Sequence, residues 1–226
     1  MDFFSWDRFL ADIPRLLPYL SVTFQIVAYA VLFGSAAGLG IAVLRIRQVR
    51  GIQWLLRIYI SFMRGTPILV QLLVVFYGLP LLLQQMGINA SRWDRSFFVY
   101  VAFALNEAAF LSEIFRSAIL AVPFGQAEAG YSVGLTRWQT LRRIVLPQAL
   151  RVALPGFGAD FIGLFQQTSL AFLIGVVDIM GRAKTIGAGS HHALEGYLLV
   201  ALVFMGISIL LRAVFAFCDR KLSYGR

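Results

Sequence analysis

Five long apolar stretches alternate with shorter polar segments along the chain. They run at about residues 20–44, 58–83, 97–121, 152–177 and 195–217. Each is close to the roughly 20 residues that an α-helix needs to cross a hydrocarbon core about 30 Å thick. Helices satisfy their own backbone hydrogen bonds, which a bilayer without water requires. The pattern therefore predicts an all-α, polytopic membrane protein with five transmembrane helices.

The composition agrees with a membrane protein. Of the 226 residues, 59% are hydrophobic and 14% are charged, and the mean hydropathy is +0.78. Soluble domains carry about 25% charged residues. The formal net charge is +9, and 18 of the 20 basic residues are arginine. In a soluble protein this would suggest nucleic acid, but here the arginines flank the apolar runs, so we expect a membrane-lipid environment and no nucleic-acid partner.

Basic residues are distributed unequally between the two sides of the spans. With the N-terminus outside, eleven fall on the cytoplasmic side: Arg45, Arg47, Arg50, Arg57, Arg137, Arg142, Arg143, Arg151, Arg220, Lys221 and Arg226. Six fall on the outer side: Arg8, Arg15, Arg92, Arg95, Arg182 and Lys184. Cytoplasmic loops are enriched in Lys and Arg. The sequence thus predicts an outer N-terminus and a cytoplasmic C-terminus.

The sequence lacks the motifs of ATP hydrolysis, disulfide formation, metal binding and signal-peptide cleavage. The G-x-x-x-x-G-K-[ST] phosphate loop is absent, so we expect no ATP hydrolysis by this chain. The single cysteine, Cys218, excludes an internal disulfide and a cysteine-based metal site. The adjacent His191 and His192 are poorly spaced for a helical metal site, so we expect no metal. The first 20 residues lack the basic start and apolar core of a cleaved signal peptide, and none is expected.

The first span contains two glycines one helical turn apart, Gly34 and Gly38, in GSAAGLG. Small residues at this spacing let a neighbouring helix approach closely. The neighbour could belong to a second subunit or to the same chain, and the sequence favours neither.

The polar segment at 122–150 interrupts the apolar pattern between the third and fourth spans. Pro123 and Gly125 are expected to stop the third span, and QAEAGYSV can form about two helical turns. Gly134 suits a left-handed helix end. Thr136 with Gln139 forms a capping-box pattern that begins a second short amphipathic helix. The segment is therefore predicted to be a helical hairpin on the cytoplasmic face, which either docks into a partner or lies on the lipid surface.

Polar side chains inside spans are costly and usually functional. We expect Glu113 and Arg116, three residues apart, to neutralise each other, and Asp160 could pair with a basic residue. Pro67 disfavours helix at the preceding residue, so the second span is expected to break there. The residues predicted to contact a substrate are Arg64, Thr66, Asn106, Glu107, Gln167, Thr168 and Ser169.

One of these substrate candidates has an alternative interpretation. Arg64 beside the break could bind a carboxylate bidentately, or it could be a boundary charge held by a lipid phosphate. Glu107 has no basic residue at i±3 or i±4, so it is the better candidate for a substrate ligand and suits an α-amino group.

One motif resembles a known family. The residues Glu128-Ala129-Gly130, then Gly134 and Ile144-x-Leu146-Pro147, resemble the EAA loop of ABC-importer permeases, with Gly130 in place of the usual Ala. The stretches FMRGTPILVQLLVVFYGLP, NEAAFLSEIFRSAI and IVLPQALRVALPG resemble the polar amino acid branch of that family. The resemblance extends from about residue 15 to the end of the chain.

The resemblance implies a type I ABC-importer permease, with residues 1–226 as a single transmembrane domain and 122–150 as its cytoplasmic coupling loop. The implied partners are two cytoplasmic ATP-binding subunits, which carry ATP and Mg²⁺, a second permease that is identical or homologous, and an extracytoplasmic solute-binding protein. The implied location is the bacterial inner membrane. The residues implied to couple to the ATPase are Gly125, Glu128, Ala129, Gly130, Gly134, Ile144, Leu146 and Pro147.

The stretch at 168–197 resembles cystine-type permeases of this branch. We therefore rank L-cystine first as the substrate, a cationic amino acid (arginine, lysine or histidine) second, and glutamine or glutamate third. The competing class of protein is an ion-driven secondary amino acid transporter.

Overall fold

The computed structural model is helical, as the sequence predicts, and describes residues 4–190 and 192–223. Five helical segments of this described part are long and apolar enough to cross a membrane. The α-helices are α1 Trp6–Leu16, α2 Leu20–Ile46, α3 Gln53–Gly65, α4 Ile68–Gln85, α5 Arg95–Leu120, α6 Phe124–Ser132, α7 Arg137–Thr140, α8 Leu146–Gln167, α9 Ile179–Ser190 and α10 Ala193–Ser223. Short 3-10 helices form η1 (Leu17–Tyr19) and η3 (Thr168–Ile174), and a π-helical turn forms η2 (Leu141–Val145).

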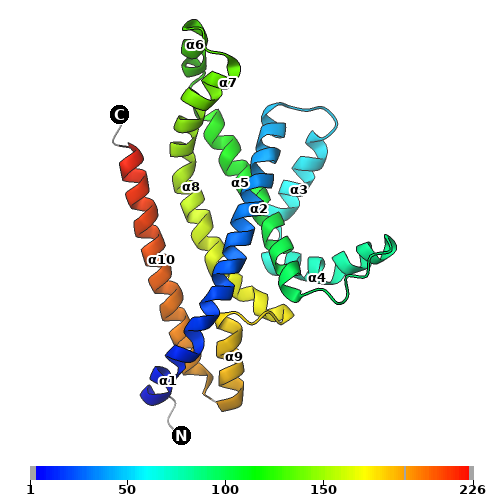
Figure 1. Ribbon diagram of the computed structural model, residues 1–226, viewed down its shortest axis with the longest axis vertical. Helices are drawn as coiled ribbons and strands as arrows, with labels where there is room; N and C mark the ends of the chain where they lie inside the picture. Colours follow the sequence, from blue (N-terminus) through cyan, green and yellow to red (C-terminus); the bar gives the residue numbers. More distant parts are fainter. Residues whose placement is uncertain (1–3, 191, 224–226) are drawn as a thin grey trace.

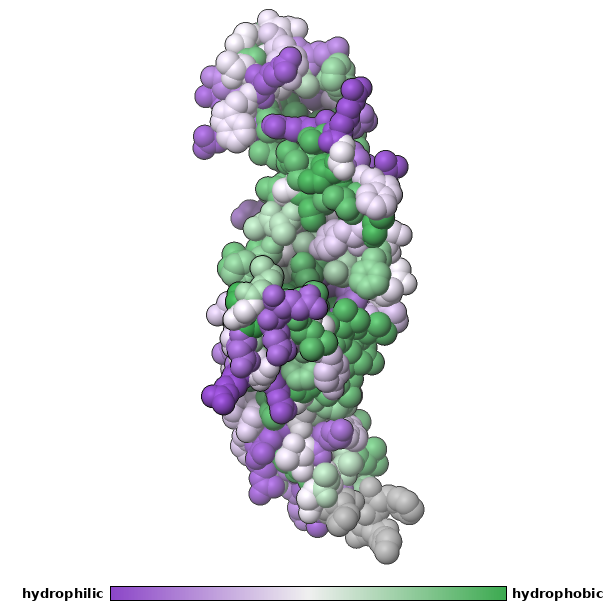
Figure 2. Space-filling model, turned by 90° about the vertical axis from the view of Figure 1, so that its right-hand side faces the viewer, coloured by the Kyte–Doolittle hydropathy of each residue, from purple (hydrophilic) through white to green (hydrophobic). Residues whose placement is uncertain are grey.

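Most of the long helices run along the long axis of the molecule (Figure 1). The α6–α7 hairpin lies at one end, on the same side as the C-terminal end of α10, while α1 and α9 lie at the other end. Helix α4 instead runs crosswise and projects to one side. Figure 2 shows hydrophobic side chains over much of one face, with hydrophilic ones at the upper end and in a patch lower down. The described ends of the chain therefore lie on opposite sides, as an odd number of spans requires.

Helix α5 is the centre of the bundle. In the most apolar window of α5, 56% of residues are buried, against 17% for α4 and 17% for α10. The main core joins α2, α4, α5, α8 and η3, and its largest fully buried side chains include Phe103 and Phe165. The exposed apolar side chains of α4 and α10 therefore face the surroundings of the chain, which are lipid or other subunits.

The close approach predicted at Gly34 and Gly38 is between α2 and α5 of the same chain. A Cβ at Gly34 would lie 2.5 Å from Cβ of Glu107, and one at Gly38 would lie 3.0 Å from the carbonyl oxygen of Ala108. The contact at Gly34 is shorter than a Cβ atom tolerates, and the one at Gly38 would require the α5 backbone to shift, so glycine suits both positions. The interpretation as packing within one chain is confirmed.

The helix boundaries agree with the sequence pattern at one point and differ from it at another. The second span is broken into α3 and α4 at the expected proline. The predicted second hairpin helix and fourth span are wrong as separate elements, because α7, η2 and α8 continue without interruption from Arg137 to Gln167. The ring of Pro147 cannot donate to the carbonyl of Arg143, and the wider π turn of η2 just before it accommodates this loss within a continuous helix.

Helices α1 and α9 were not part of the five-span prediction, and buried carboxyl groups position both. The Oδ1 atom of Asp178 accepts a hydrogen bond of 2.8 Å from the backbone of Gly181 at the start of α9, and burial raises the pKa of Asp178 to about 6. Oε1 of Glu195 accepts from the Ser5 backbone at 2.9 Å and lies 3.1 Å from Nδ1 of His192. His191, the other member of the adjacent histidine pair, lies outside the described residues.

We predict that Gly38→Val destabilises the bundle, whereas Gly40→Val on the same helix does not. The new side chain at Gly38 meets backbone atoms of α5 at 3.0–3.1 Å, and backbone cannot move aside as a flexible side chain can. Overpacking of this kind costs about 1–3 kcal/mol. A Cβ at Gly40 meets nothing within 4 Å. Thermal unfolding in detergent measures the difference; equal stability of the two variants would contradict the α2–α5 contact.

Candidate functional site

The break between α3 and α4 is buried and stabilised by side chains. Thr66 is extended, and Gln71 on α4 is 2% exposed. The Nε2 of Gln71 donates to the backbone oxygens of Met63 at 2.8 Å and Thr66 at 2.9 Å, and to Oγ1 of Thr66 at 2.9 Å. Asn106 of α5 in turn donates to Oε1 of Gln71 at 2.8 Å. The carbonyl groups freed by the break are thereby satisfied without water.

Gln71 was missed by the sequence reasoning, although it is a lone amide in an otherwise apolar run four residues after Pro67. Two of the predicted substrate contacts, Thr66 and Asn106, belong to the same network. The hydroxyl of Thr66 also donates to Phe62 at 2.8 Å. What the structure shows for both residues is that they hold the break, and a direct contact with substrate stays a prediction.

A pair of acidic side chains lies next to this break. Glu107 on α5 is 4% exposed, and its carboxyl group is within hydrogen-bonding reach of Asp160 on α8. Arg64, at the end of α3, is close enough to interact electrostatically with Asp160, and its guanidinium lies 5.4 Å from the ring centre of Phe110. Two adjacent carboxyl groups in an apolar medium need a proton or a cation between them. The site therefore has an acidic side, formed by Glu107 and Asp160, and a basic side, formed by Arg64.

A basic partner was predicted for Asp160, but the residue within hydrogen-bonding reach of it is the acid Glu107, while the basic Arg64 interacts with it electrostatically. Oδ2 of Asp160 is buried without a hydrogen-bond partner in the described part of the chain. Asp160 and Gln167 are seven residues apart and so share one face of α8. The side chain of Gln167 is exposed. Three helices therefore bring together Arg64, Glu107 and Asp160, with Gln167 two turns further along.

The remaining candidates behave differently. The hydroxyl of Thr168 is buried and donates to the Phe165 carbonyl at 2.7 Å, and that of Ser169 donates to the Gln166 carbonyl at 3.0 Å. Both hydroxyl groups are used by the turn of η3 itself. Thr168 and Ser169 follow Gln167 directly in the sequence but do not share a surface with it. A helix distributes consecutive side chains around its axis.

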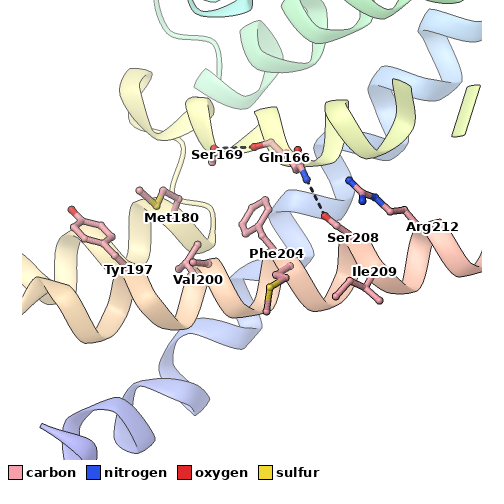
Figure 3. Close-up of a pocket in the computed structure, with 11 residues that line it drawn as sticks. Gln166, Ser169, Met180, Tyr197, Val200, Phe204, Ser208, Ile209 and Arg212 are labelled. Atoms are coloured by element: carbon pink, nitrogen blue, oxygen red, sulfur yellow. Dashed lines mark hydrogen bonds between the residues drawn. The ribbon is translucent and has the colours of Figure 1, made fainter. Parts of the chain in front are cut away.

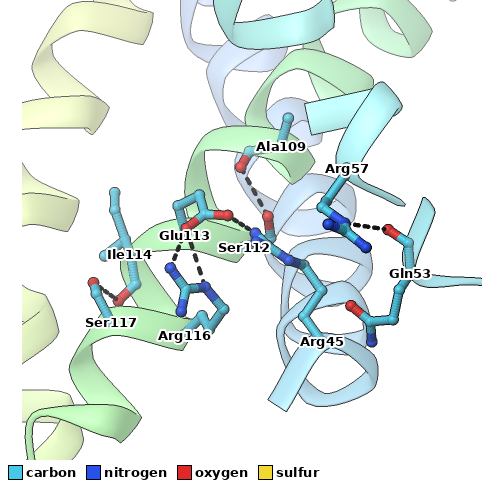
Figure 4. A network of polar contacts seen from close by, with 9 residues as sticks. All are labelled: Arg45, Gln53, Arg57, Ala109, Ser112, Glu113, Ile114, Arg116 and Ser117. Atoms are coloured by element: carbon cyan, nitrogen blue, oxygen red, sulfur yellow. Dashed lines mark hydrogen bonds and ion pairs between the residues drawn. The ribbon is translucent and has the colours of Figure 1, made fainter. Parts of the chain in front are cut away.

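The acid–base pair predicted near the other end of α5 is confirmed, and it includes a third residue. Arg116 donates to Oε2 of Glu113 through Nη2 at 2.8 Å and Nε at 3.1 Å. Arg45, at the end of α2, forms an ion pair with the other oxygen of Glu113. Figure 4 shows Glu113 between the two guanidinium groups. This cluster fastens α2 to α5.

The 122–150 segment has the predicted hairpin geometry. Gly134 has φ +83°, and the amides of Gly134 and Leu135 donate to carbonyl groups in the last turn of α6. The predicted capping box at Thr136 is present on both sides. A Cβ at Gly130 would lie 2.9 Å from Cδ1 of Ile144 and 3.0 Å from Thr140. Glycine at the third position of the Glu128-Ala129-Gly130 motif therefore lets α6 pack closely on the following helix.

Comparison with known proteins identifies the class. Residues 30–224 match the family model described as binding-protein-dependent transport system inner membrane component. The chain is 42% identical over 210 residues to the L-cystine transport system permease protein TcyL of Bacillus subtilis (strain 168), covering 93% of this chain and 88% of that protein. It is 37% identical to the probable amino-acid permease protein YxeN of the same organism, covering 99% of this chain and 98% of that one.

Solved structures of ABC transporters are similar to this chain as well. A crystal structure of an amino acid ABC transporter with histidines matches with a TM-score of 0.81 and 29% identity, covering 94% of this chain and 98% of that chain. The inward-facing MetNI methionine ABC transporter matches with a TM-score of 0.73 at 18% identity, again covering 94% and 98%, which supports the fold alone. The chain belongs to the binding-protein-dependent inner membrane components, among the amino acid permeases of ABC transporters.

Family membership has two consequences. The chain is a multi-pass permease of an ABC importer, which rules out the ion-driven secondary transporter. It works in an assembly with permease and ATPase partners, and ATP hydrolysis is carried out by the separate ATPase subunits.

We predict that Gln71→Leu destabilises the protein by about 2–3 kcal/mol, because it removes the donor to the Thr66 carbonyl and leaves the Met63 carbonyl and the Asn106 amide with only their mutual hydrogen bond of 3.4 Å. The matched control is Gln84→Leu, an exposed glutamine on the same helix, which we expect to be near neutral. Denaturant unfolding in detergent micelles measures both. Equal midpoints for the two variants would show that the break does not depend on this network.

Proposed function

We propose that this chain carries a zwitterionic amino acid through the membrane, and that L-cystine is the substrate. The observation that carries the proposal is the acidic pair Glu107 and Asp160 on α5 and α8, with Arg64 on the neighbouring α3. An α-ammonium group suits the acidic side, because it supplies the cation that two adjacent carboxyl groups lack. An α-carboxylate suits a planar guanidinium, which binds it through two parallel hydrogen bonds.

The choice of cystine is supported by similarity. Two relatives are cystine permeases, TcyL at 42% identity and TcyB at 38%. The arginine permease ArtQ of Bacillus subtilis is 31% identical, and the glutamate/aspartate permease GltK of Escherichia coli is 32% identical. A cationic amino acid is the second candidate, because two carboxyl groups face one arginine here. Glutamine or glutamate ranks third, since neither brings a second positive charge.

The assembly we propose contains two cytoplasmic ATP-binding subunits, a second permease and an extracytoplasmic binding protein, in a bacterial inner membrane. The outer end would be the one with α1 and α9, and the α6–α7 hairpin would be cytoplasmic. The hairpin supports a docking role because its tip exposes large apolar side chains, with Phe124 at 74%, Val133 at 76% and Trp138 at 65% exposure. The residues proposed to transmit movement are those of the EAA-like motif, Gly125, Glu128, Ala129, Gly130, Gly134, Ile144, Leu146 and Pro147.

We predict that Glu107→Gln and Asp160→Asn each lower uptake at least tenfold while the transporter still assembles, since each removes half of the acidic pair. Arg64→Lys should also impair uptake, because an ammonium cannot reproduce a planar two-point contact. Its control is Arg57→Lys, an exposed arginine on the same face of α3. The measurement is uptake of cystine, arginine and glutamine by proteoliposomes with the complete transporter.

The outcomes separate the candidates. Uptake of cystine with weak competition by arginine supports the first substrate, and the reverse supports the second. Wild-type kinetics in Glu107→Gln would remove that residue from the pathway, and wild-type kinetics in Arg64→Lys would make Arg64 a boundary charge.

We predict that Gly134→Val uncouples transport from ATP hydrolysis. A β-branched residue is strained at φ +83°, so the hairpin shifts while the spans, which do not contact this position, stay folded. Gly51→Val is the control, because this glycine has a similar φ of +88° and no neighbours within 4 Å but lies outside the hairpin, between α2 and α3. ATPase co-purification and the ratio of substrate transported to ATP hydrolysed are measured. Wild-type values of both would revive the interpretation that the hairpin lies on lipid.

A further inference from the structure

A cavity of about 530 Å³ lies between α8 and α10, away from the acidic pair. Figure 3 shows its polar groups on one side, where Nε2 of Gln166 donates to Oγ of Ser208 at 3.2 Å and Arg212 lies one turn further along α10. The rest of the wall is apolar, with Val200, Phe204, Met205 and Ile209 among its side chains. The cavity therefore has a small polar region and a long apolar wall, which is the character of a site for an amphiphile.

Arg212 carries an exposed charge within an apolar helix. It lies eleven residues before the end of α10, which is about 16 Å along the axis. No ion pair joins it to any described residue. Figure 3 shows its guanidinium pointing back along α10 toward Ser208, away from the nearer helix end. Because the side chain does not extend toward that membrane surface, its charge needs an anion inside the groove.

The carboxyl groups of this chain do not supply that anion well. Those inside the spans already contact other side chains or each other: Glu107, Glu113, Asp160 and Glu195. Asp219 lines a neighbouring hollow that Arg212 also borders, but it lies seven residues away, about 10 Å along the helix. A second copy of this chain would bring the same acids, and those named inside its spans already have contacts of their own. A lipid phosphate is an anion that the membrane itself provides.

The dimensions of the cavity fit the rest of a lipid. Its wall extends from Arg212 to Tyr197 along α10, about 22 Å. One leaflet of the hydrocarbon core is about 15 Å thick. An acyl chain that starts from a phosphate at Arg212 can therefore lie against Ile209, Met205 and Phe204 over its whole length. We propose that the α8–α10 cavity binds one anionic phospholipid, with its phosphate on Arg212 and an acyl chain along the apolar wall.

The test uses the complete transporter, purified from nanodiscs that contain phosphatidylglycerol and phosphatidylethanolamine, with bound lipid measured by native mass spectrometry. We expect wild-type protein to retain phosphatidylglycerol, and Arg212→Gln to reduce this retention at least tenfold without changing that of phosphatidylethanolamine. Arg212→Lys should keep most of it, because a phosphate accepts any cation. The matched control is Arg220→Gln, an exposed arginine two turns further along the same helix.

A second variant tests the apolar wall. Ala201→Trp fills the cavity but keeps Arg212, and we expect it to lose the bound phosphatidylglycerol as well. Retention equal to wild type in Arg212→Gln would overturn the proposal. So would efficient cross-linking between two copies through Met205→Cys in a Cys218→Ser background, because the cavity would then be filled by a second permease. Gel filtration of each variant distinguishes lost lipid from a lost fold.

Discussion

The hydrocarbon core contains no water, so every polar group within it must find a partner in the protein, in a substrate or in a lipid. This constraint explains the parts of the structure that a plain helical bundle would not need. The break at Thr66 is tolerated because Gln71 and Asn106 replace the lost backbone hydrogen bonds. Glu113 is tolerated because two arginines surround it. Asp160 has a buried oxygen without a hydrogen-bond partner among the described residues, and Arg212 forms no ion pair with them, so these are places where we expect something else to bind.

Helix α5 links these features. Its Asn106 holds the α3–α4 break, its Glu107 meets Asp160, and its Glu113 fixes the end of α2. The glycine contacts of α2 keep this helix from shifting, because there is no space for even a methyl group between them. The acidic pair therefore has one member on a fixed helix. The other member is on α8, which packs against α5 through smaller side chains such as Ala149 and Ala153.

The sequence predicted the features that depend on local chemistry. The five spans were predicted from the length and apolarity of the stretches, and the break from Pro67. The helix cap in the hairpin was predicted from Thr136 and Gln139. It did not predict that Asp160 meets another acid, because that contact joins residues 53 positions apart on two helices whose relative rotation no local pattern specifies. Gln71 was missed for the same reason. Its partners are carbonyl groups that only the folded break exposes. The continuity of α7 with α8 was also missed. A proline such as Pro147 normally ends a helix, but here the π turn just before it keeps the helix continuous.

That continuity connects the hairpin to the acidic pair. From the cap at Thr136 the chain is helical without interruption to Gln167, and Asp160 lies 24 residues along it, about 36 Å from the cap. A packed helix transmits displacement along its axis because its interior is close-packed and resists compression. A shift of the hairpin would therefore move Asp160 relative to Glu107, which the glycine contacts hold in place. Since the attraction of two carboxyl groups for a cation depends steeply on their separation, such a movement would change how tightly the pair holds an ammonium group. The single continuous helix thus supplies a physical route by which a movement of the α6–α7 hairpin reaches the acidic pair.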